Sequence, residues 1–80
     1  MGGRYIGVLT HWDAAEGFGE ITMAGHAPLV CHRDQLRAAG VVKPVLGMSL
    51  SFTIGVIGRG ITGAADIERV APAVRLGVVR

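Results

Sequence analysis

The sequence predicts an all-β domain, a small antiparallel barrel of five strands. Thirteen glycines are spread through 80 residues and leave few windows long enough for an amphipathic helix. Within residues 48–57, MSLSFTIGVI, apolar and polar side chains alternate from Met48 to Ile54, which is typical of a strand with one buried face. A chain of this length supports one hydrophobic core, so we expect a single domain over residues 1–70.

Three strands are expected in the first half of the chain. The segment RYIGVLTHW, residues 4–12, is rich in β-branched and aromatic residues, and DAAEG, 13–17, supplies a turn before GFGEITM, 17–23. A second turn, AGHAP at 24–28, leads to the short apolar segment LVCH at 29–32. These segments predict an antiparallel meander.

One short helix is expected next, over RDQLRAAG at residues 33–40. Asp34 is the expected N-cap, Leu36 is expected to face inward, and Gly40 is expected to end the helix in the left-handed conformation. The following segment, VVKPVLG at 41–47, predicts an irregular crossover because proline cannot donate to a central strand ladder.

The second half supplies the remaining two strands. Residues 48–57 form the fourth, GRGITG at 58–63 is expected to be a glycine-rich loop, and AADIERV at 64–70 is the fifth, with Ile67 in the core. Five short strands with a long connection between the third and the fourth are typical of a Greek-key barrel of the oligonucleotide/oligosaccharide-binding (OB) type.

Composition limits the compartment and the partners. Cys31 is the only cysteine, so no disulfide can form within the chain, and nothing in the cysteine count indicates an oxidising compartment. We find no segment typical of a signal peptide, a lipidation site or a membrane span, and we expect a cytoplasmic protein with no membrane partner. Residues 1–40 carry a net charge of −1 and residues 41–80 a net charge of +3, a modest basic character for a nucleic-acid binder.

Three segments together resemble the cold-shock domain family. GVLTHWDAAEGFGEI at 7–21, LVCH at 29–32 and GMSLSFTI at 47–54 are similar to the strands of that family, and the similarity extends over roughly residues 4–70. The resemblance implies a five-stranded barrel of the OB type that binds single-stranded RNA or DNA. It also implies a role in regulating gene expression or as an RNA chaperone, without catalysis and without a cofactor.

The resemblance, together with strand alternation, gives a candidate binding surface. In GFGEI, alternation sends Phe18 and Glu20 outward and Ile21 inward, and in LVCH it sends Val30 and His32 outward. We expect nucleic acid to contact a single platform of aromatic and cationic side chains, with help from a loop arginine. The expected nucleic-acid-binding residues are His11, Trp12, Phe18, His32, Arg33 and Arg59.

This platform is depleted in comparison with the family. Glu20 and Val30 stand where the family has Phe, Arg33 replaces an aromatic and Glu16 replaces Lys. Each lost ring removes roughly 1–3 kcal/mol of stacking with a base, and added carboxylates repel phosphate, so we expect weak binding. The alternative is a protein-interaction module that has lost nucleic-acid binding and uses a face of Trp12, Phe18, Glu20 and Val30.

Other chemistry is not favoured by the sequence. Gly58, Gly60 and Gly63 match the glycine spacing of dinucleotide-binding loops, but the required βαβ unit does not follow. Cys31 and His32 are adjacent on a strand and point to opposite faces, so we expect no metal site there. We expect Cys31 to be a small buried hydrophobe and predict no enzyme activity.

The last ten residues, APAVRLGVVR at 71–80, lie beyond the resemblance and are apolar. Val74, Leu76 and Val78 alternate, so a sixth strand is expected, added to an edge of the same chain or of a second copy. Exchange between copies would give a homodimer. The remaining alternative is a frayed terminus.

Overall fold

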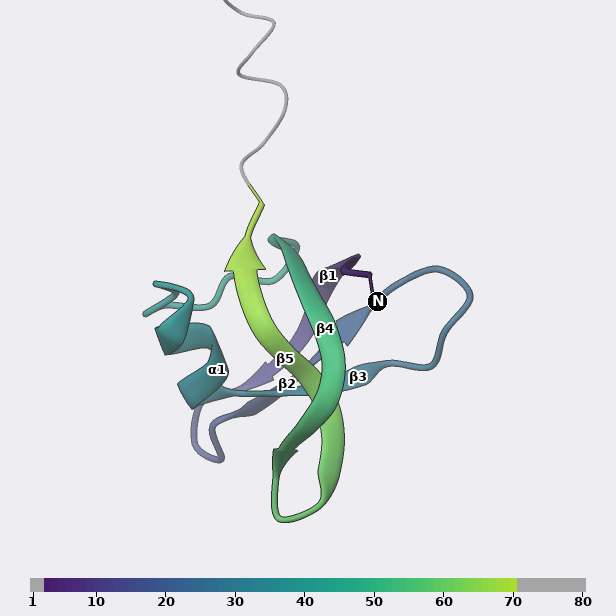
Figure 1. Cartoon of the computed structure of the whole chain (residues 1–80). Coiled ribbons are helices and arrows are strands. Elements are labelled where there is room, and N and C mark those ends of the chain that lie inside the picture. Colours follow the sequence, from purple (N-terminus) through teal and green to yellow (C-terminus); the bar gives the residue numbers. More distant parts are fainter. Residues whose placement is uncertain (1–2, 71–80) are drawn as a thin grey trace, which may run out of the picture.

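The computed structural model describes residues 3–70, which form five strands and one short helix (Figure 1). The elements in chain order are β1 (Tyr5–Asp13), β2 (Phe18–Thr22), β3 (Leu29–His32), α1 (Arg33–Ala38), β4 (Ser49–Gly58) and β5 (Ile61–Arg69). The sheet closes on itself in the order β1-β2-β3-β5-β4, so that β4 lies beside β1. The expected all-β class with five strands is confirmed, and the expected strand at 29–32 has the predicted bounds.

One strand pair departs from the expected antiparallel arrangement. The meander β1-β2-β3 is antiparallel, as are the pairs of β4 with β1 and with β5. β3 and β5, however, run parallel and pair only at Val30 and Gly63. In a closed ring of five strands the directions cannot alternate throughout, because five is an odd number, so at least one neighbouring pair must run parallel.

Gly63 makes this closure sterically feasible. A Cβ atom on Gly63 would collide with the carbonyl oxygen of Val30 and lie 3.0 Å from Cδ1 of Ile57. A strand glycine without a side chain is typical of a close backbone approach. The ring therefore closes at a position where any larger residue would push β3 and β5 apart.

The loop expected at 58–63 is much shorter in the structure. β4 continues to Gly58 and pairs there with Ile61, so only two residues, Arg59 and Gly60, connect the strands. Both residues have positive φ, 44° and 80°, as a two-residue type I′ hairpin turn requires. The glycine density indicated a loop, whereas one tight turn and the close contact of Gly63 account for these glycines.

Helix α1 begins at a different cap from the expected one. The Nδ1 atom of His32 accepts a hydrogen bond from the backbone N–H of Asp34 at 3.0 Å, so His32 and not Asp34 is the N-cap. Strand β3 ends at His32, and the helix therefore starts two residues too early for Asp34 to occupy the cap position.

The C-terminal end of α1 follows the prediction. Gly40 has a φ of 84°, its N–H donates to the Arg37 carbonyl at 2.9 Å, and the Val41 N–H donates to the Leu36 carbonyl at 2.8 Å. These two bonds form a Schellman motif, which a left-handed residue such as glycine permits. Leu36 and Val41 are both buried, so the motif also turns the crossover toward the core.

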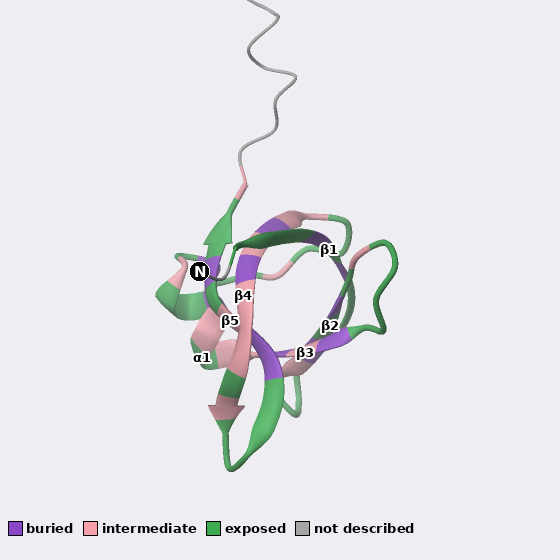
Figure 2. Ribbon diagram, turned by 45° about the vertical axis from the view of Figure 1, so that its right-hand side comes forward, coloured by how far each residue is buried: buried purple, intermediate pink, exposed green. Residues whose placement is uncertain are grey.

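The core fills the inside of the ring, where Figure 2 shows the buried segments. Its buried hydrophobic residues are Leu9, Ile21, Leu29, Cys31, Leu36, Val41, Leu50, Phe52, Ala64 and Ile67. The alternation predicted for β4 is confirmed, since Leu50 and Phe52 are fully buried and Met48 and Ile54 pack against the core. The inward orientation of Leu36, Cys31 and Ile67 is confirmed as well.

No helix within residues 3–70 is long and apolar enough to cross a membrane. The predicted sixth strand and the homodimer through the tail concern residues 71–80, which lie outside the described residues.

Candidate nucleic-acid interface

Two cross-strand pairs form the centre of the outward surface of β2 and β3. Phe18 lies opposite His32, and Glu20 lies opposite Val30. Glu20 is exposed and the other three are half-buried, while the intervening Gly19, Ile21 and Cys31 are buried, so the predicted alternation is confirmed. Directly opposed side chains on one face of a sheet contact each other, and the two pairs therefore form a continuous surface.

Strand β1 adds His11 to this surface. The register between β1 and β2 shifts between Leu9 and His11, so that Leu9 pairs with Ile21 and His11 pairs with Glu20. Such an irregularity inserts one extra residue and changes which side chains face outward. His11 is consequently exposed beside Glu20, close to where it was expected.

The β4–β5 hairpin supplies the other border. A hollow of about 280 Å³ is lined by Phe18 and His32 together with Ile57, Arg59 and Ile61. A neighbouring hollow of about 370 Å³ also contains Ile61 and Phe18 and extends to His11 and Val30. We call the surface formed by His11, Phe18, Glu20, Val30, His32, Arg59 and Ile61 the sheet face.

The sheet face brings together four of the six residues predicted to bind nucleic acid: His11, Phe18, His32 and Arg59. Ile61 was missed, because it falls in the segment expected to be a loop. The pairing of Gly58 with Ile61 across the tight turn is what turns Ile61 toward Phe18. No pattern in the sequence indicated this contact.

The rings of Phe18 and His32 contact each other directly. Their centroids are 4.8 Å apart with an interplanar angle of 75°, an edge-to-face arrangement. Such pairs hold aromatic rings in a defined orientation. His32 is held further by its N-cap bond to the backbone of Asp34.

Carboxylates surround one side of this surface. Asp13, Glu16 and Glu20 all line the hollow that contains Phe18 and Val30. Asp13 has a structural role, since its Oδ1 atom accepts hydrogen bonds from the N–H groups of Ala15 at 3.0 Å and Glu16 at 3.1 Å and so forms the turn between β1 and β2. Within residues 3–70, the carboxylates of Glu16 and Glu20 are exposed and accept no hydrogen bond of this kind.

Trp12 does not lie on the sheet face, and the expectation of a single platform is wrong in this respect. Trp12 pairs with Gly19, and both residues lie on the inward side of the sheet. The ring of Trp12 packs against the core. Because adjacent residues of a strand point to opposite sides, His11 and Trp12 cannot both face outward. The ring of Trp12 instead lines a cavity beside α1.

The two glycines that flank Phe18 are explained by this packing. A Cβ atom on Gly19 would collide with the His11 carbonyl oxygen and would lie 2.7 Å from Cε3 of Trp12. A Cβ atom on Gly17 would lie 2.8 Å from Nη2 of Arg33. Neighbouring parts of the same chain therefore occupy the space that the missing side chains leave.

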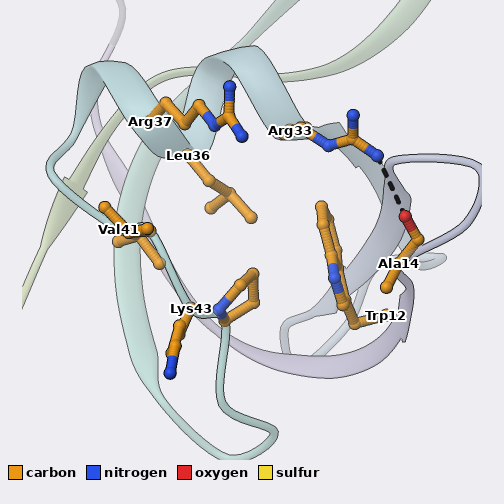
Figure 3. Close-up of a pocket in the computed structure, with 9 residues that line it drawn as sticks. Trp12, Ala14, Arg33, Leu36, Arg37, Val41 and Lys43 are labelled. Carbon is orange, nitrogen blue, oxygen red and sulfur yellow. Dashed lines mark hydrogen bonds between the residues drawn. The ribbon is translucent and has the colours of Figure 1, made fainter.

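Arg33 also lies away from the sheet face. Its Nη2 atom donates to the Ala14 carbonyl oxygen at 2.9 Å, and its backbone N–H donates to the Gly17 carbonyl at 2.8 Å. Arg33 therefore ties the start of α1 to the β1–β2 turn (Figure 3). This tie gives Arg33 a structural role in addition to the predicted binding role.

The cavity beside α1 has a volume of about 400 Å³. Figure 3 shows Trp12 on one wall, Leu36 and Val41 on the opposite side, and the two arginines along the helix. We call this site the Trp12 cavity; its lining residues are Trp12, Ala14, Arg33, Leu36, Arg37, Val41, Val42, Lys43 and Pro44. Arg37 and Lys43 were missed as site residues, although the i, i+4 spacing of Arg33 and Arg37 on the expected helix indicated a shared face.

Cys31 lies directly beneath the sheet face and is fully buried. Burial raises the pKa of its thiol to about 11; a hydrogen bond from the Gly19 backbone opposes this shift and the charge of Glu20 adds to it. A neutral buried thiol is a small hydrophobe and not a nucleophile. Within residues 3–70, no three His, Cys, Asp or Glu side chains gather in a way that could hold a metal ion.

In comparisons with known proteins, no family model, no curated protein and no solved structure matches this chain.

Proposed function

We propose that this protein is a binding module for single-stranded RNA or DNA, without catalytic activity, that acts in the regulation of gene expression or as an RNA chaperone. The observation that carries the proposal is the edge-to-face pair of Phe18 and His32 on the outward surface of the sheet. Exposed rings on a sheet give bases a surface for stacking, worth roughly 1–3 kcal/mol per base and tolerant of sequence. Bases would stack on Phe18 and His32, and His11 would extend the surface toward β1.

Arg59 supports the same function. It occupies the tip of the β4–β5 hairpin with a φ of 44°, a conformation that Asn, Asp or Gly adopts at lower cost. An unfavourable residue at a turn tip suggests that the side chain serves another purpose. Its guanidinium lies at the edge of the hollow that contains Phe18 and His32, where it would pair with a phosphate.

The proposed binding is weak and decreases with salt. Glu16 and Glu20 lie beside the stacking pair and repel phosphates, whereas Arg59 is the one cation that lines the sheet-face hollows of the described chain. Few phosphate contacts also give a shallow dependence of affinity on salt concentration. Sequence-tolerant, low-affinity binding is the expected result.

The proposal includes a more specific fold, a Greek-key barrel of the OB type as in cold-shock domains. The strand order supports it: β4 returns through a long connection to lie beside β1, so that four strands are arranged as β4-β1-β2-β3. This is the spatial order of a Greek key. In OB folds, the face of strands 2 and 3 binds oligonucleotides, and the sheet face lies on β2 and β3.

A direct test is the binding of an oligothymidine with hydroxyl groups at both ends to wild-type protein and to the variant Phe18→Ala. We expect measurable binding at low salt and an affinity roughly fivefold to a hundredfold lower for the variant, as expected when one stacking ring is lost. Val56→Ala is the matched control, because Val56 is an exposed apolar residue outside the sheet face. Absence of binding by folded wild-type protein would refute the proposal.

A second function, recognition of a protein partner, is favoured by the pair of Glu20 and Val30. These residues lie opposite each other at the centre of the surface and make it aliphatic and acidic where bases would stack. Val30 and Ile61 line the same hollow, so an apolar side chain of a partner would contact both. The face proposed earlier for such a partner would then consist of Phe18, Glu20 and Val30, without Trp12.

The double variant Glu16→Lys with Glu20→Phe distinguishes the two functions. If the sheet face binds nucleic acid, the variant gains a ring and loses two repulsive charges, so its affinity for the oligothymidine increases by more than tenfold. If the sheet face binds a protein, the oligothymidine affinity stays negligible in both forms.

A further inference from the structure

The Trp12 cavity differs in charge from both hollows of the sheet face. Its lining contains Arg33, Arg37 and Lys43 and no carboxylate, whereas each sheet-face hollow contains at least one. The net charge of the whole chain is only +2, so this local concentration of cations is not a consequence of general basicity. The cavity therefore attracts anions more strongly than the surface around it.

The cations are not neutralised by the protein itself. Among the described residues, the one ion pair of an arginine or lysine joins Arg4 to Glu68, and none involves a cation of the cavity. Arg33 uses one guanidinium nitrogen for the Ala14 carbonyl, and its other N–H groups remain for a ligand. Arg37 and Lys43 are exposed, and an anion can reach both from solvent.

The helix and the crossover place these groups around one space. Arg33, Leu36 and Arg37 follow the i, i+3, i+4 spacing and share one face of α1. Figure 3 shows Arg33 and Arg37 along this helix and Lys43 at the opposite rim, with the flat ring of Trp12 forming a wall. The site thus combines cations at its rim with an aromatic wall and the aliphatic side chains of Leu36 and Val41.

We propose that the Trp12 cavity binds one nucleotide with a terminal phosphate, with its base against Trp12 and its phosphate beside Arg33 and Arg37 at the α1 rim. A monoester phosphate carries a charge of about −1.5 to −2 at neutral pH and offers three oxygens, more than an internal phosphodiester. Arginine binds such groups with two parallel hydrogen bonds. The cavity volume of about 400 Å³ falls within the range of roughly 300–1,000 Å³ that is usual for small-ligand sites.

The ligand is a nucleoside monophosphate, either free or as the 5′ end of a strand. This site is separate from the sheet face, because Trp12 lines only the cavity and Phe18 lines only the sheet-face hollows. The proposal therefore does not require that the sheet face binds nucleic acid.

The test uses Trp12, the only tryptophan, as a fluorescent reporter of its own cavity. Uridine 5′-monophosphate is expected to change the emission of the folded protein in a saturable manner, whereas uridine and inorganic phosphate each bind at least tenfold more weakly. Arg37→Gln is expected to weaken binding of the nucleotide by about tenfold, since it removes a charged hydrogen bond. Lys43→Gln removes a cation from the opposite rim and is expected to weaken binding less. Arg69→Gln, which removes an exposed cation of β5 outside the cavity, is the control and leaves the affinity unchanged.

Two further probes identify the source of the phosphate. If an oligothymidine with a 5′-phosphate binds more tightly than the free nucleotide and than the same strand with a 5′-hydroxyl, the ligand is a strand end. If the free nucleotide binds at least as tightly, the ligand is the free nucleotide.

The proposal is overturned if uridine binds as well as its monophosphate, if neither Arg37→Gln nor Lys43→Gln weakens binding, or if a glutamate-rich peptide binds more tightly than the nucleotide. If Phe18→Ala loses binding of the oligothymidine but still binds the nucleotide, the Trp12 cavity and the sheet face are separate sites.

Discussion

His32 is in contact with Phe18 through its ring and with the backbone of Asp34 through its Nδ1 atom. The ring centroids of His32 and Phe18 are 4.8 Å apart, and the hydrogen bond from the Asp34 N–H is 3.0 Å long. The end of β3, the start of α1 and the orientation of the stacking pair are therefore set by one side chain. Two variants can separate these roles.

The variant His32→Asn keeps an acceptor at the N-cap and removes the ring, whereas His32→Ala removes both. Both variants lose the ring contact with Phe18, but Asn is among the best N-cap residues, so we expect His32→Asn to be about 1 kcal/mol more stable than His32→Ala. Both variants lose a stacking surface, so both are expected to bind the oligothymidine about tenfold more weakly. Denaturant unfolding and oligonucleotide titration are the two measurements. Full binding by the stable His32→Asn variant would show that this ring is not part of the site.

The hairpin tip provides a second prediction. Arg59→Asn places a residue that tolerates positive φ at a position where φ is 44°. The variant should be at least as stable as wild type, because the turn is relieved of a small strain, and it should bind the oligothymidine more weakly with a lower salt dependence. Thermal unfolding and binding at two salt concentrations test both parts. Unchanged affinity and salt dependence would exclude a phosphate contact by Arg59.

The closure of the ring provides a third prediction, for which Gly55 on the neighbouring strand β4 offers a control. In Gly63→Ala the new methyl group collides with the Val30 carbonyl oxygen, so we expect a loss of about 1–3 kcal/mol of stability or failure to fold. In Gly55→Ala the new methyl group meets only Cβ of Ala65, at 3.8 Å, and we expect no loss. Equal stability of the two variants would mean that β3 and β5 do not approach as closely as described.

The pKa of Cys31 gives a pH dependence. Since burial raises this pKa from 9.0 to about 11, the unfolded chain releases the thiol proton at a lower pH than the folded protein does. The contribution of Cys31 to stability is therefore complete below pH 9 and is lost as the pH rises toward 11. Denaturant unfolding of wild type and Cys31→Ala across this range should give a stability difference that changes steadily in favour of the variant. A constant difference would contradict the raised pKa.

The strand pattern was accessible from the sequence because it depends on local alternation. Leu50 and Phe52 alternate with polar residues, and in the structure both are fully buried, as predicted. The β3–β5 contact was not accessible in this way, because Val30 and Gly63 are far apart in the sequence and their pairing depends on the path of the crossover. Gly63 was assigned to a loop because glycine has the same local signal in a turn as at a close backbone contact.

The candidate site was only partly predictable for a related reason. Phe18 and His32 follow from alternation within short strands, and both lie where they were expected. Trp12 was assigned to the same surface, but the register shift between Leu9 and His11 turns His11 outward and Trp12 toward the core. Lys43 lies in an irregular segment with no periodicity, so only the three-dimensional arrangement brings it to the Trp12 cavity.

The central claim is that the sheet face binds a single strand, and amide chemical shifts measured during titration with the hydroxyl-ended oligothymidine test it most directly. The account predicts that the largest shifts at low salt occur at residues 18–20, 30–32 and 59–61, with small shifts at Ser49, Ser51 and Thr53 on β4. The shifts should become smaller when salt is added. Shifts confined to other residues, or no shifts in the folded protein, would contradict the account.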